Sequence, residues 1–302
     1  MIMPEKNSIQ FKAAIACLLW SSAFVGVKVG LAYTSPFLLA GLRCLLAGLI
    51  LIPFSGNIKS NFKIIWKNRR LVLTIAGLQT VIMYGLYFSG INLLPSAVAA
   101  LIIGAAPLVT AVLTHLHMKD DRMTRKKMLT IAFGIAGIVF VISGRQTFEF
   151  AGYKDLIGAF LLIVNMVVAS YSSIVVAKSS GTMNPVLLNF SQLTIGGIVL
   201  ILVSFIFESP LRVEFNINFI LALSWISFLS ASAFSIWFSI LNKPNVKVSE
   251  LDMWKFFIPV FGAILSWIIL PNESPTIISI TGMIIITSSI IFYYLPGKNR
   301  IN

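Results

Sequence analysis

Ten apolar runs, most of them about 20 residues long, dominate this sequence. They cover roughly residues 12–33, 37–54, 71–92, 95–117, 128–144, 155–177, 185–207, 218–241, 249–270 and 276–295. An α-helix needs about 20 apolar residues to cross the hydrocarbon core of a bilayer. The chain is therefore expected to be an all-α polytopic membrane protein with ten transmembrane helices.

Composition excludes a soluble globule. The chain is 58% hydrophobic and 11% charged, whereas soluble domains carry about 25% charged residues. Its net charge is +13, but the cations lie in short segments between apolar runs, where they attract anionic lipid and set orientation. Membrane lipid is therefore the expected partner of these charges, and nucleic acid is not.

The distribution of lysine and arginine predicts the orientation. If the N-terminus is inside, 17 of the 23 cations fall in cytoplasmic segments, three fall outside, and three lie within spans. This excess on one side follows the positive-inside rule. We expect a multi-pass protein of the inner membrane with both termini in the cytoplasm and the first apolar run retained as a span.

The two halves of the chain resemble each other. "YGLYFSGIN" at 84–92 matches "FSIWFSILN" at 234–242, an offset of 150 residues. Pro36 matches Pro185, and Pro107 matches Pro259, at nearly the same offset. These colinear matches predict a duplication, with five spans in residues 1–144 and five in 145–302. An odd number of spans inverts the second copy, an arrangement typical of secondary transporters.

Several segments resemble one known family. They are "LLWSSAFVGVKVGL", "LAGLRCLLAGLIL", "PSAVAALIIGAAPLVTAVL" with "DDRMT", and "PNESPT". Together they are similar to the EamA type of the drug/metabolite transporter superfamily. The resemblance implies ten helices in two inverted five-helix repeats, a central substrate cavity and export of amino acids or related metabolites. The chain departs from the family pattern at Asp121, where glutamate is usual, and at Thr130, where glycine is usual.

The expected function is secondary transport of amino acids or related small metabolites by alternating access, as an exporter or exchanger. Two alternatives stay open: a carrier of another anionic metabolite, nucleotide-like or phosphorylated, and a membrane sensor or assembly subunit that does not transport. An enzyme is not expected, because the sequence has no metal-ligand helix motif, no paired intramembrane carboxylates and no Ser/His pair at helical spacing. No catalytic residue, metal or cofactor is therefore predicted.

Three cations lie inside apolar runs, where a charge is costly, and each has a structural and a functional interpretation. Lys28 could extend to the outer headgroups, or take part in binding or gating. Arg43 could bond to backbone carbonyls, or contact a substrate carboxylate at an outer gate. Lys255 could pair with Asp252 on the same helix face, or meet an anionic group in the cavity.

Polar and aromatic residues at mid-depth complete the predicted binding site. Each alone is more often a packing residue, but together they could hold a small amphipathic solute that bears a carboxylate or phosphate. They are Trp20, Ser21, Ser22, Tyr84, Tyr87, Asn165, Tyr171 and Trp237. The carboxylates Asp155, Glu250 and Asp252 fall near the ends of spans. That placement favours facilitated diffusion or exchange over proton coupling. The oligomeric state is not predicted.

Two further features concern motion and the lipid surface. Pro107 and Pro259 are each expected to interrupt a span near its middle, and with Gly104 they are predicted to form paired hinges; ordinary kinks are the alternative. The segment "NIKSNFKIIWKNRR" at 57–70 carries apolar and basic residues on neighbouring helical faces. It is expected to be either a short helix on the inner leaflet or a solvated basic loop.

Overall fold

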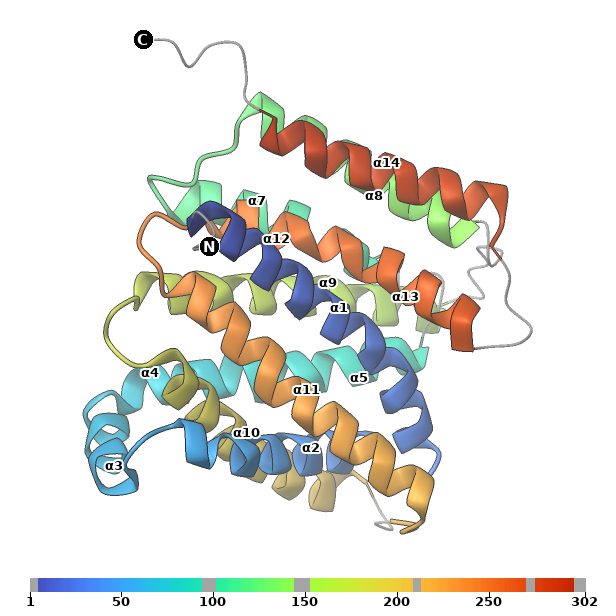
Figure 1. Cartoon of the computed structure of the whole chain (residues 1–302). Helices are drawn as coiled ribbons and strands as arrows, with labels where there is room; N and C mark the ends of the chain where they lie inside the picture. The colour runs from blue at the N-terminus through green and yellow to red at the C-terminus, as the bar shows by residue number, and fades with distance from the viewer. Residues whose placement is uncertain (1–4, 94–101, 144–152, 209–212, 270–274, 296–302) are drawn as a thin grey trace.

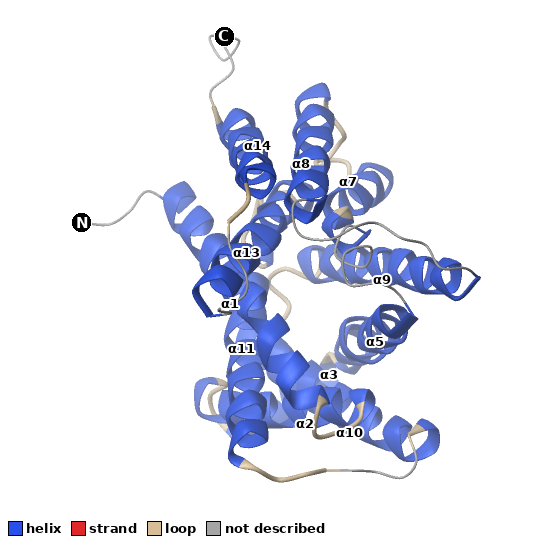
Figure 2. Ribbon diagram, turned by 90° about the vertical axis from the view of Figure 1, so that its right-hand side faces the viewer, coloured by secondary structure: helices blue, strands red, loops and turns tan. Residues whose placement is uncertain are grey.

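The computed structural model describes residues 5–93, 102–143, 153–208, 213–269 and 275–295. Within these ranges the side chains of a few helical residues, Lys28 among them, also lie outside the described part. The described residues are almost entirely helical, as Figure 2 shows. Their one β-type pairing is a single bridge between Thr34 and Val213. The expected all-α fold is therefore confirmed.

The helices follow the expected spans closely. In the first half they are α1 (Glu5–Leu31), α2 (Pro36–Leu51), the 3-10 turn η1 (Ile52–Phe54), α3 (Ile58–Lys67), α4 (Arg69–Ile75), the π-helical segment η2 (Ala76–Ile82), α5 (Met83–Leu93), α7 (Ala106–His117) and α8 (Arg125–Ser143). In the second half they are α9 (Tyr153–Lys178), α10 (Pro185–Phe207), α11 (Ile217–Leu241), α12 (Val248–Asp252), the 3-10 segment η3 (Met253–Phe256), α13 (Phe257–Ile269) and α14 (Ile277–Tyr294).

Within the described ranges, six helical stretches are long and apolar enough to cross a membrane. They are Pro36–Phe54, Arg69–Ile91, Tyr153–Lys178, Pro185–Phe207, Ile217–Leu241 and Ile277–Tyr294. The other four expected spans correspond to α1, α7, α8 and the broken helix from α12 to α13. Figure 1 shows these helices side by side in one bundle, in which α1 begins and α14 ends on the same side.

Helix contacts follow the pattern of a duplicated chain. The second spans of the two halves, α2 and α10, pack together, and so do the fifth spans, α8 and α14. The first span of each half packs against the third span of the other, as α1 with α11 and α9 with α5. Such reciprocal pairing arises when two repeats are related by a two-fold axis. The expected boundary between residues 144 and 145 lies outside the described residues.

The paired spans run in opposite directions. Gly48 of α2 lies beside Thr194 of α10, whereas Gly41, earlier in α2, lies beside Ile201, later in α10. At the other edge of the bundle, Gly137 of α8 lies against Gly282 of α14. Figure 1 places these two pairs at opposite edges, with α1, α5, α9, α11 and α13 between them. A site between the central helices therefore draws residues from both repeats.

Both predicted proline positions lie next to irregular backbone. The helix before α7 is broken at Ala105, with φ −79° and ψ 0°, between Gly104 and Pro107. In the ninth span the 3-10 segment η3 ends just before α13, in which Pro259 is the third residue. The breaks therefore precede the prolines instead of falling on them. A proline in the first turn of a helix costs no intrahelical hydrogen bond, because that N–H has no partner there anyway.

Carboxylates from each half cap a helix of the other half. Glu208, which follows α10, accepts hydrogen bonds from the backbone N–H groups of Phe37 (2.7 Å) and Leu38 (3.1 Å) at the start of α2. Asp121, which precedes α8, accepts from the backbone N–H of Ser249 (2.8 Å) at the start of α12. Such caps satisfy orphan donors and complement the positive end of the helix. They join the two halves at opposite ends of the bundle (Figure 1).

The segment at 57–70 contains the short helix α3, as one of its two interpretations predicts. Phe62 and Trp66 are 68% and 63% exposed on α3, and their rings stack with centroids 6.5 Å apart. The Arg69 guanidinium lies 5.4 Å from the Trp66 ring centroid. An exposed aromatic pair beside cations suits the headgroup region of a membrane. Contact with lipid remains a prediction.

Candidate functional site

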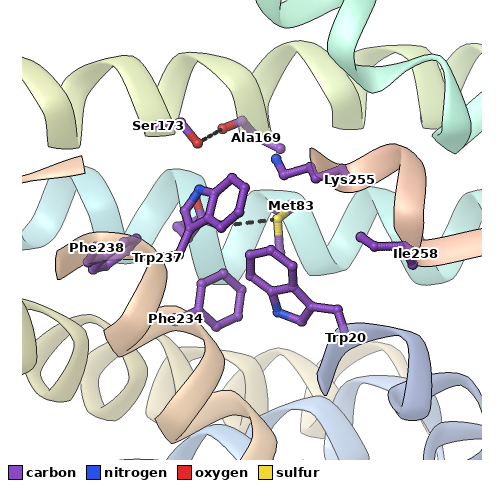
Figure 3. A pocket seen from close by; sticks show the side chains of 10 residues that line it. Trp20, Met83, Ala169, Ser173, Phe234, Trp237, Phe238, Lys255 and Ile258 are labelled. Carbon is purple, nitrogen blue, oxygen red and sulfur yellow. Dashed lines mark hydrogen bonds between the residues drawn. The ribbon is translucent and has the colours of Figure 1, made fainter. Parts of the chain in front are cut away.

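A cavity of about 160 Å³ lies between the central helices. Its lining comes from α1, η2, α5, α9, α11, η3 and α13, so both halves of the chain contribute (Figure 3). The lining residues are Trp20, Gln79, Met83, Ala169, Ser173, Phe234, Trp237, Phe238, Lys255 and Ile258. Trp20, Trp237 and Lys255 are the members of this set that the sequence predicts for substrate binding.

Aromatic rings form one wall of the cavity. The Trp20 ring centroid lies 4.9 Å from that of Trp237 and 5.5 Å from that of Phe234. These tilted and edge-on arrangements fit the charge distribution of aromatic rings. The wall presents π-faces to the cavity, and such faces pack against apolar groups and attract cations.

Lys255 supplies the one positive charge among the lining residues. It belongs to η3, where its Nζ lies 5.1 Å from the Trp237 ring centroid and 2.5 Å from Asp252 Oδ1. Its side chain is 21% exposed, whereas that of Asp252 is 1% exposed. The pairing with Asp252 is therefore present, and the Lys255 side chain also lines the cavity. Contact of Lys255 with an anionic group stays a prediction.

Gln79 is one of the lining residues that the sequence analysis missed. It lies on the π-helical segment η2, lines the cavity and is 7% exposed. Its Nε2 lies 3.5 Å from Met83 Sδ, a weak acceptor, and its Oε1 has no hydrogen-bond partner among the described residues. An amide inside an apolar run was the available signal, the same that selected Asn165. Wide π turns occur frequently at functional sites.

A polar chain lies behind Lys255. Thr110 of α7 donates a hydrogen bond to Asp252 Oδ2 (2.5 Å), and its hydroxyl lies 2.7 Å from that of Ser170 on α9. Beyond the ion pair with Lys255, no hydrogen-bond partner of Asp252 Oδ1 lies in the part of the chain that the structure describes. The sequence places Asp252 near the end of a span, but α7 and α9 cover it, so that it is a buried carboxylate beside the cavity.

Several predicted residues lie outside this cavity and bond within the helix framework, and Ser22 also lines a second pocket of about 660 Å³ between α1 and α11, where it accepts from Trp225 Nε1 at 3.2 Å. Ser21 and Ser22 donate to the carbonyls of Leu18 and Leu19 in their own helix, each at 2.7 Å. Asn165 donates to the carbonyl of Met83 at 2.6 Å.

Two other predicted residues also fall outside the cavity lining. Tyr171 is 41% exposed and lies edge-on to His117, with ring centroids 5.8 Å apart. Lys28 lies in α1, and its side chain is outside the described part.

Arg43 and Tyr84 form a second buried cluster, between α2 and α5. Arg43 is 6% exposed, lies 4.3 Å above the Tyr84 ring centroid and donates a hydrogen bond to the Tyr84 hydroxyl. Tyr87 packs beside this cluster, with its ring centroid 5.5 Å from that of Phe88. None of these residues lines the cavity. Arg43 therefore has a phenol as its partner, and neither a backbone carbonyl nor a carboxylate bonds to it among the described residues.

Within the described ranges, no group of three or more His, Cys, Asp or Glu residues could hold a metal ion. The polar groups of the cavity lining are the Lys255 ammonium, the Gln79 amide and the Ser173 hydroxyl, which stand beside a wall of aromatic rings. Such a lining can bind a small polar solute.

Comparison with known proteins gives a consistent result. The model of the EamA-like transporter family matches the chain twice, over residues 8–143 and 156–295. The uncharacterized transporter YvbV of Bacillus subtilis is 26% identical over 94% of this chain and 91% of its own.

A relative that is named for its substrate and one solved structure have lower sequence identity to this chain. An S-adenosylmethionine/S-adenosylhomocysteine transporter of Chlamydia muridarum is 23% identical over 88% of this chain and 85% of its own. One solved crystal structure superposes with a TM-score of 0.81 at 20% identity, covering 96% of this chain and 97% of the other, and shows the same fold.

Proposed function

The chain belongs to the EamA-like transporter family, and from that premise we propose that it carries amino acids or related small carboxylates by alternating access. The observation that carries this proposal is Lys255, a single ammonium in an aromatic cavity to which both repeats contribute. A cavity shared by two inverted repeats is the usual place for a transported solute.

The cavity suits a small solute with a carboxylate at one end. The carboxylate would pair with Lys255, and the apolar part would pack on Trp20 and Trp237. An amino group would find Gln79 Oε1 or an aromatic face. The volume of about 160 Å³ is below the 300–1,000 Å³ typical of drug-sized ligands. The size of this cavity favours an amino acid over S-adenosylmethionine, for which the Chlamydia muridarum relative is named, and over a nucleotide-like solute.

Alternating access would use the reciprocal contacts between the halves. Opening the cavity to one side requires the capping contact of Glu208 or that of Asp121 to loosen. The irregular backbone next to Gly104, Pro107 and Pro259 would absorb the bend. The excess of cations in alternate loops supports an inner-membrane location with both termini in the cytoplasm.

Counterflow in proteoliposomes tests the proposal. Vesicles are loaded with unlabelled L-leucine, and entry of labelled L-leucine is followed, with methionine, alanine and glutamate as further solutes. We expect saturable exchange that Lys255→Gln slows by about tenfold to a hundredfold, since a charged hydrogen bond contributes about 1.5–3 kcal/mol. Carriers saturate and exchange solute, whereas sensors and assembly subunits do neither.

Two controls separate binding from folding. Lys178→Gln makes the same change at an exposed position on α9 and should leave exchange intact. The double variant Lys255→Gln/Asp252→Asn removes the buried pair without leaving an unpaired carboxylate, and should be folded yet slow. Exchange at the unmodified rate in Lys255→Gln would refute the assigned role, and no exchange of any solute would refute transport of amino acids.

Gln79→Leu should raise KM for L-leucine about tenfold with little change in the maximal rate, because the amino group loses an acceptor. The same change should not lower thermal stability, since it removes a buried amide oxygen that has no partner.

Gln192→Leu is the matched control. Gln192 is fully buried, donates to Asn189 (2.9 Å) and accepts from Thr80, so its loss should lower stability. An unchanged KM in Gln79→Leu would remove Gln79 from the binding site.

A further inference from the structure

Asp252 is a buried carboxylate that solute recognition does not require. It is 1% exposed, bonds to Thr110 and pairs with Lys255, whose ammonium lines the cavity. A solute carboxylate that binds Lys255 must therefore share the cation on which Asp252 depends. The two events, solute binding and loss of charge compensation at Asp252, are coupled by this one ammonium.

The other elements packed against Asp252 supply little additional charge. α7 and α9 present hydroxyls, α1 presents a thiol, α11 presents a ring to Lys255, and α14 presents a phenol to Trp254. The nearest other carboxylates, Glu250 and Asp121, each already have a lysine partner, and α13 adds no charged group among its described residues. The hydroxyls belong to Thr110 and Ser170, the thiol to Cys17, the ring to Trp237 and the phenol to Tyr294, while Lys247 pairs with Glu250 and Lys127 with Asp121.

We propose that Asp252 is the proton-coupling group of the carrier: a solute with net charge −1 crosses together with one proton bound at Asp252, whereas a zwitterionic amino acid crosses without one. The inference rests on the proposed function. It concerns the coupling ion. The sequence analysis favours facilitated diffusion or exchange over proton coupling, because the carboxylates, Asp252 among them, fall near the ends of spans.

Charge balance in the cavity dictates the coupling. In the absence of solute, the ion pair of Asp252 with Lys255 gives the site a net charge of zero. A bound monoanion would bring the buried site to −1, and a proton on Asp252 restores zero. Without solute, a protonated Asp252 would leave the site at +1. The site is therefore neutral in two forms: the ion pair without solute, and the site with the anion bound and Asp252 protonated. Burial favours these neutral forms during the conformational change.

A zwitterion changes this balance. Its own charges sum to zero, so the site stays neutral with Asp252 ionised. The amino group cannot replace the proton by pairing with Asp252, because that carboxylate is 1% exposed and is enclosed by Thr110 and Lys255. A proton can reach the carboxylate where an ammonium group cannot. L-Leucine and its 2-oxo analogue, 2-oxo-4-methylpentanoate, share a carbon skeleton and differ in the amino group, so they form a matched pair of probes.

The experiment measures uptake of the two labelled probes into proteoliposomes, with the membrane potential clamped. Each rate is measured at equal pH and with the outside more acidic, and the rate of protein-free vesicles is subtracted because the protonated oxo acid crosses lipid unaided. For the oxo acid, the pH gradient should raise the protein-dependent initial rate, because one coupled proton adds a driving force equal to about tenfold accumulation per pH unit. L-Leucine should not accumulate. A pH dye inside the vesicles should report acidification with the oxo acid only.

Asp252→Asn should abolish the pH response of oxo-acid uptake. The readout is the ratio of rates with and without the gradient within one variant, so a lower overall rate does not affect it. The coupling is overturned if this ratio in Asp252→Asn equals that of the unmodified protein, if both probes respond equally, or if a sodium gradient drives uptake instead. Exchange at equal pH without any response to the gradient also overturns the coupling but leaves the proposed function standing. Absence of exchange with either probe and with the wider panel overturns both.

Discussion

Replacing Asp121 by Asn should lower the free energy of unfolding by about 3–5 kcal/mol, the cost of breaking a buried ion pair and leaving one partner charged. Asp121 and Lys127 pair with side chains that are 1% and 2% exposed. Asparagine can still accept from the Ser249 backbone N–H, but it carries no charge to compensate the lysine. Unfolding of the purified protein in detergent, followed by heat or denaturant, measures the loss.

A double-mutant cycle identifies the cause. Asp120→Asn changes the neighbouring aspartate, which is exposed, and should be nearly neutral. Asp121→Asn/Lys127→Met removes both charges and should recover much of the lost stability, since apolar replacement of a buried pair is often neutral. If Asp121→Asn matched Asp120→Asn in stability, the ion pair would contribute nothing to the fold.

The same contact also bears on the site. Asp121 caps α12, and α12 continues directly into η3, which carries Lys255. A carboxylate of the first repeat thus fixes the start of the broken helix that presents the cavity cation from the second repeat. Loss of this cap should therefore alter solute affinity as well as stability, which a defect confined to packing at the bundle end would not do.

The helical framework could be predicted from the sequence because it depends on signals that are local or repeated. Apolar runs long enough to cross a bilayer form transmembrane helices, because a helix satisfies its own backbone hydrogen bonds. The offset of about 150 residues between Pro36 and Pro185, and between Pro107 and Pro259, indicates the duplication. The pairing of Lys255 with Asp252 followed from their spacing on one helix face. Trp20 and Trp237, which the sequence analysis selects as aromatic residues at mid-depth, line one cavity.

What the sequence could not reveal depends on contacts across the bundle. Gln79 enters the cavity from a π-helical segment, and an apolar run gives no sign of such a wide turn. The depth of Asp252 depends on α7 and α9, which supply Thr110 and Ser170 from positions more than 80 residues away. The partner of Arg43 is a phenol 41 residues along the chain. Position within a span predicts depth along the helix but not the direction in which a side chain faces.

Gly137→Ala should separate α8 from α14 and cost about 2–3 kcal/mol, because the added methyl group meets backbone atoms that cannot move independently. A Cβ at Gly137 would lie 2.8 Å from the carbonyl oxygen of Gly282 and 3.0 Å from the amide nitrogen of Ile286. Gly41→Ala, at the equivalent contact of α2 with α10, would place its Cβ 3.0 Å from the carbonyl oxygen of Gly197 and should have a similar effect.

Gly262→Ala makes the same change on α13, where nothing lies within 4 Å of the added Cβ. It should leave stability unchanged or raise it by up to about 1 kcal/mol, the difference in helix propensity. The opposite signs make thermal unfolding a direct test of close packing between equivalent spans. If Gly137→Ala and Gly262→Ala gave the same melting temperature, the glycine contacts would be incidental, and other contacts would have to hold these spans together.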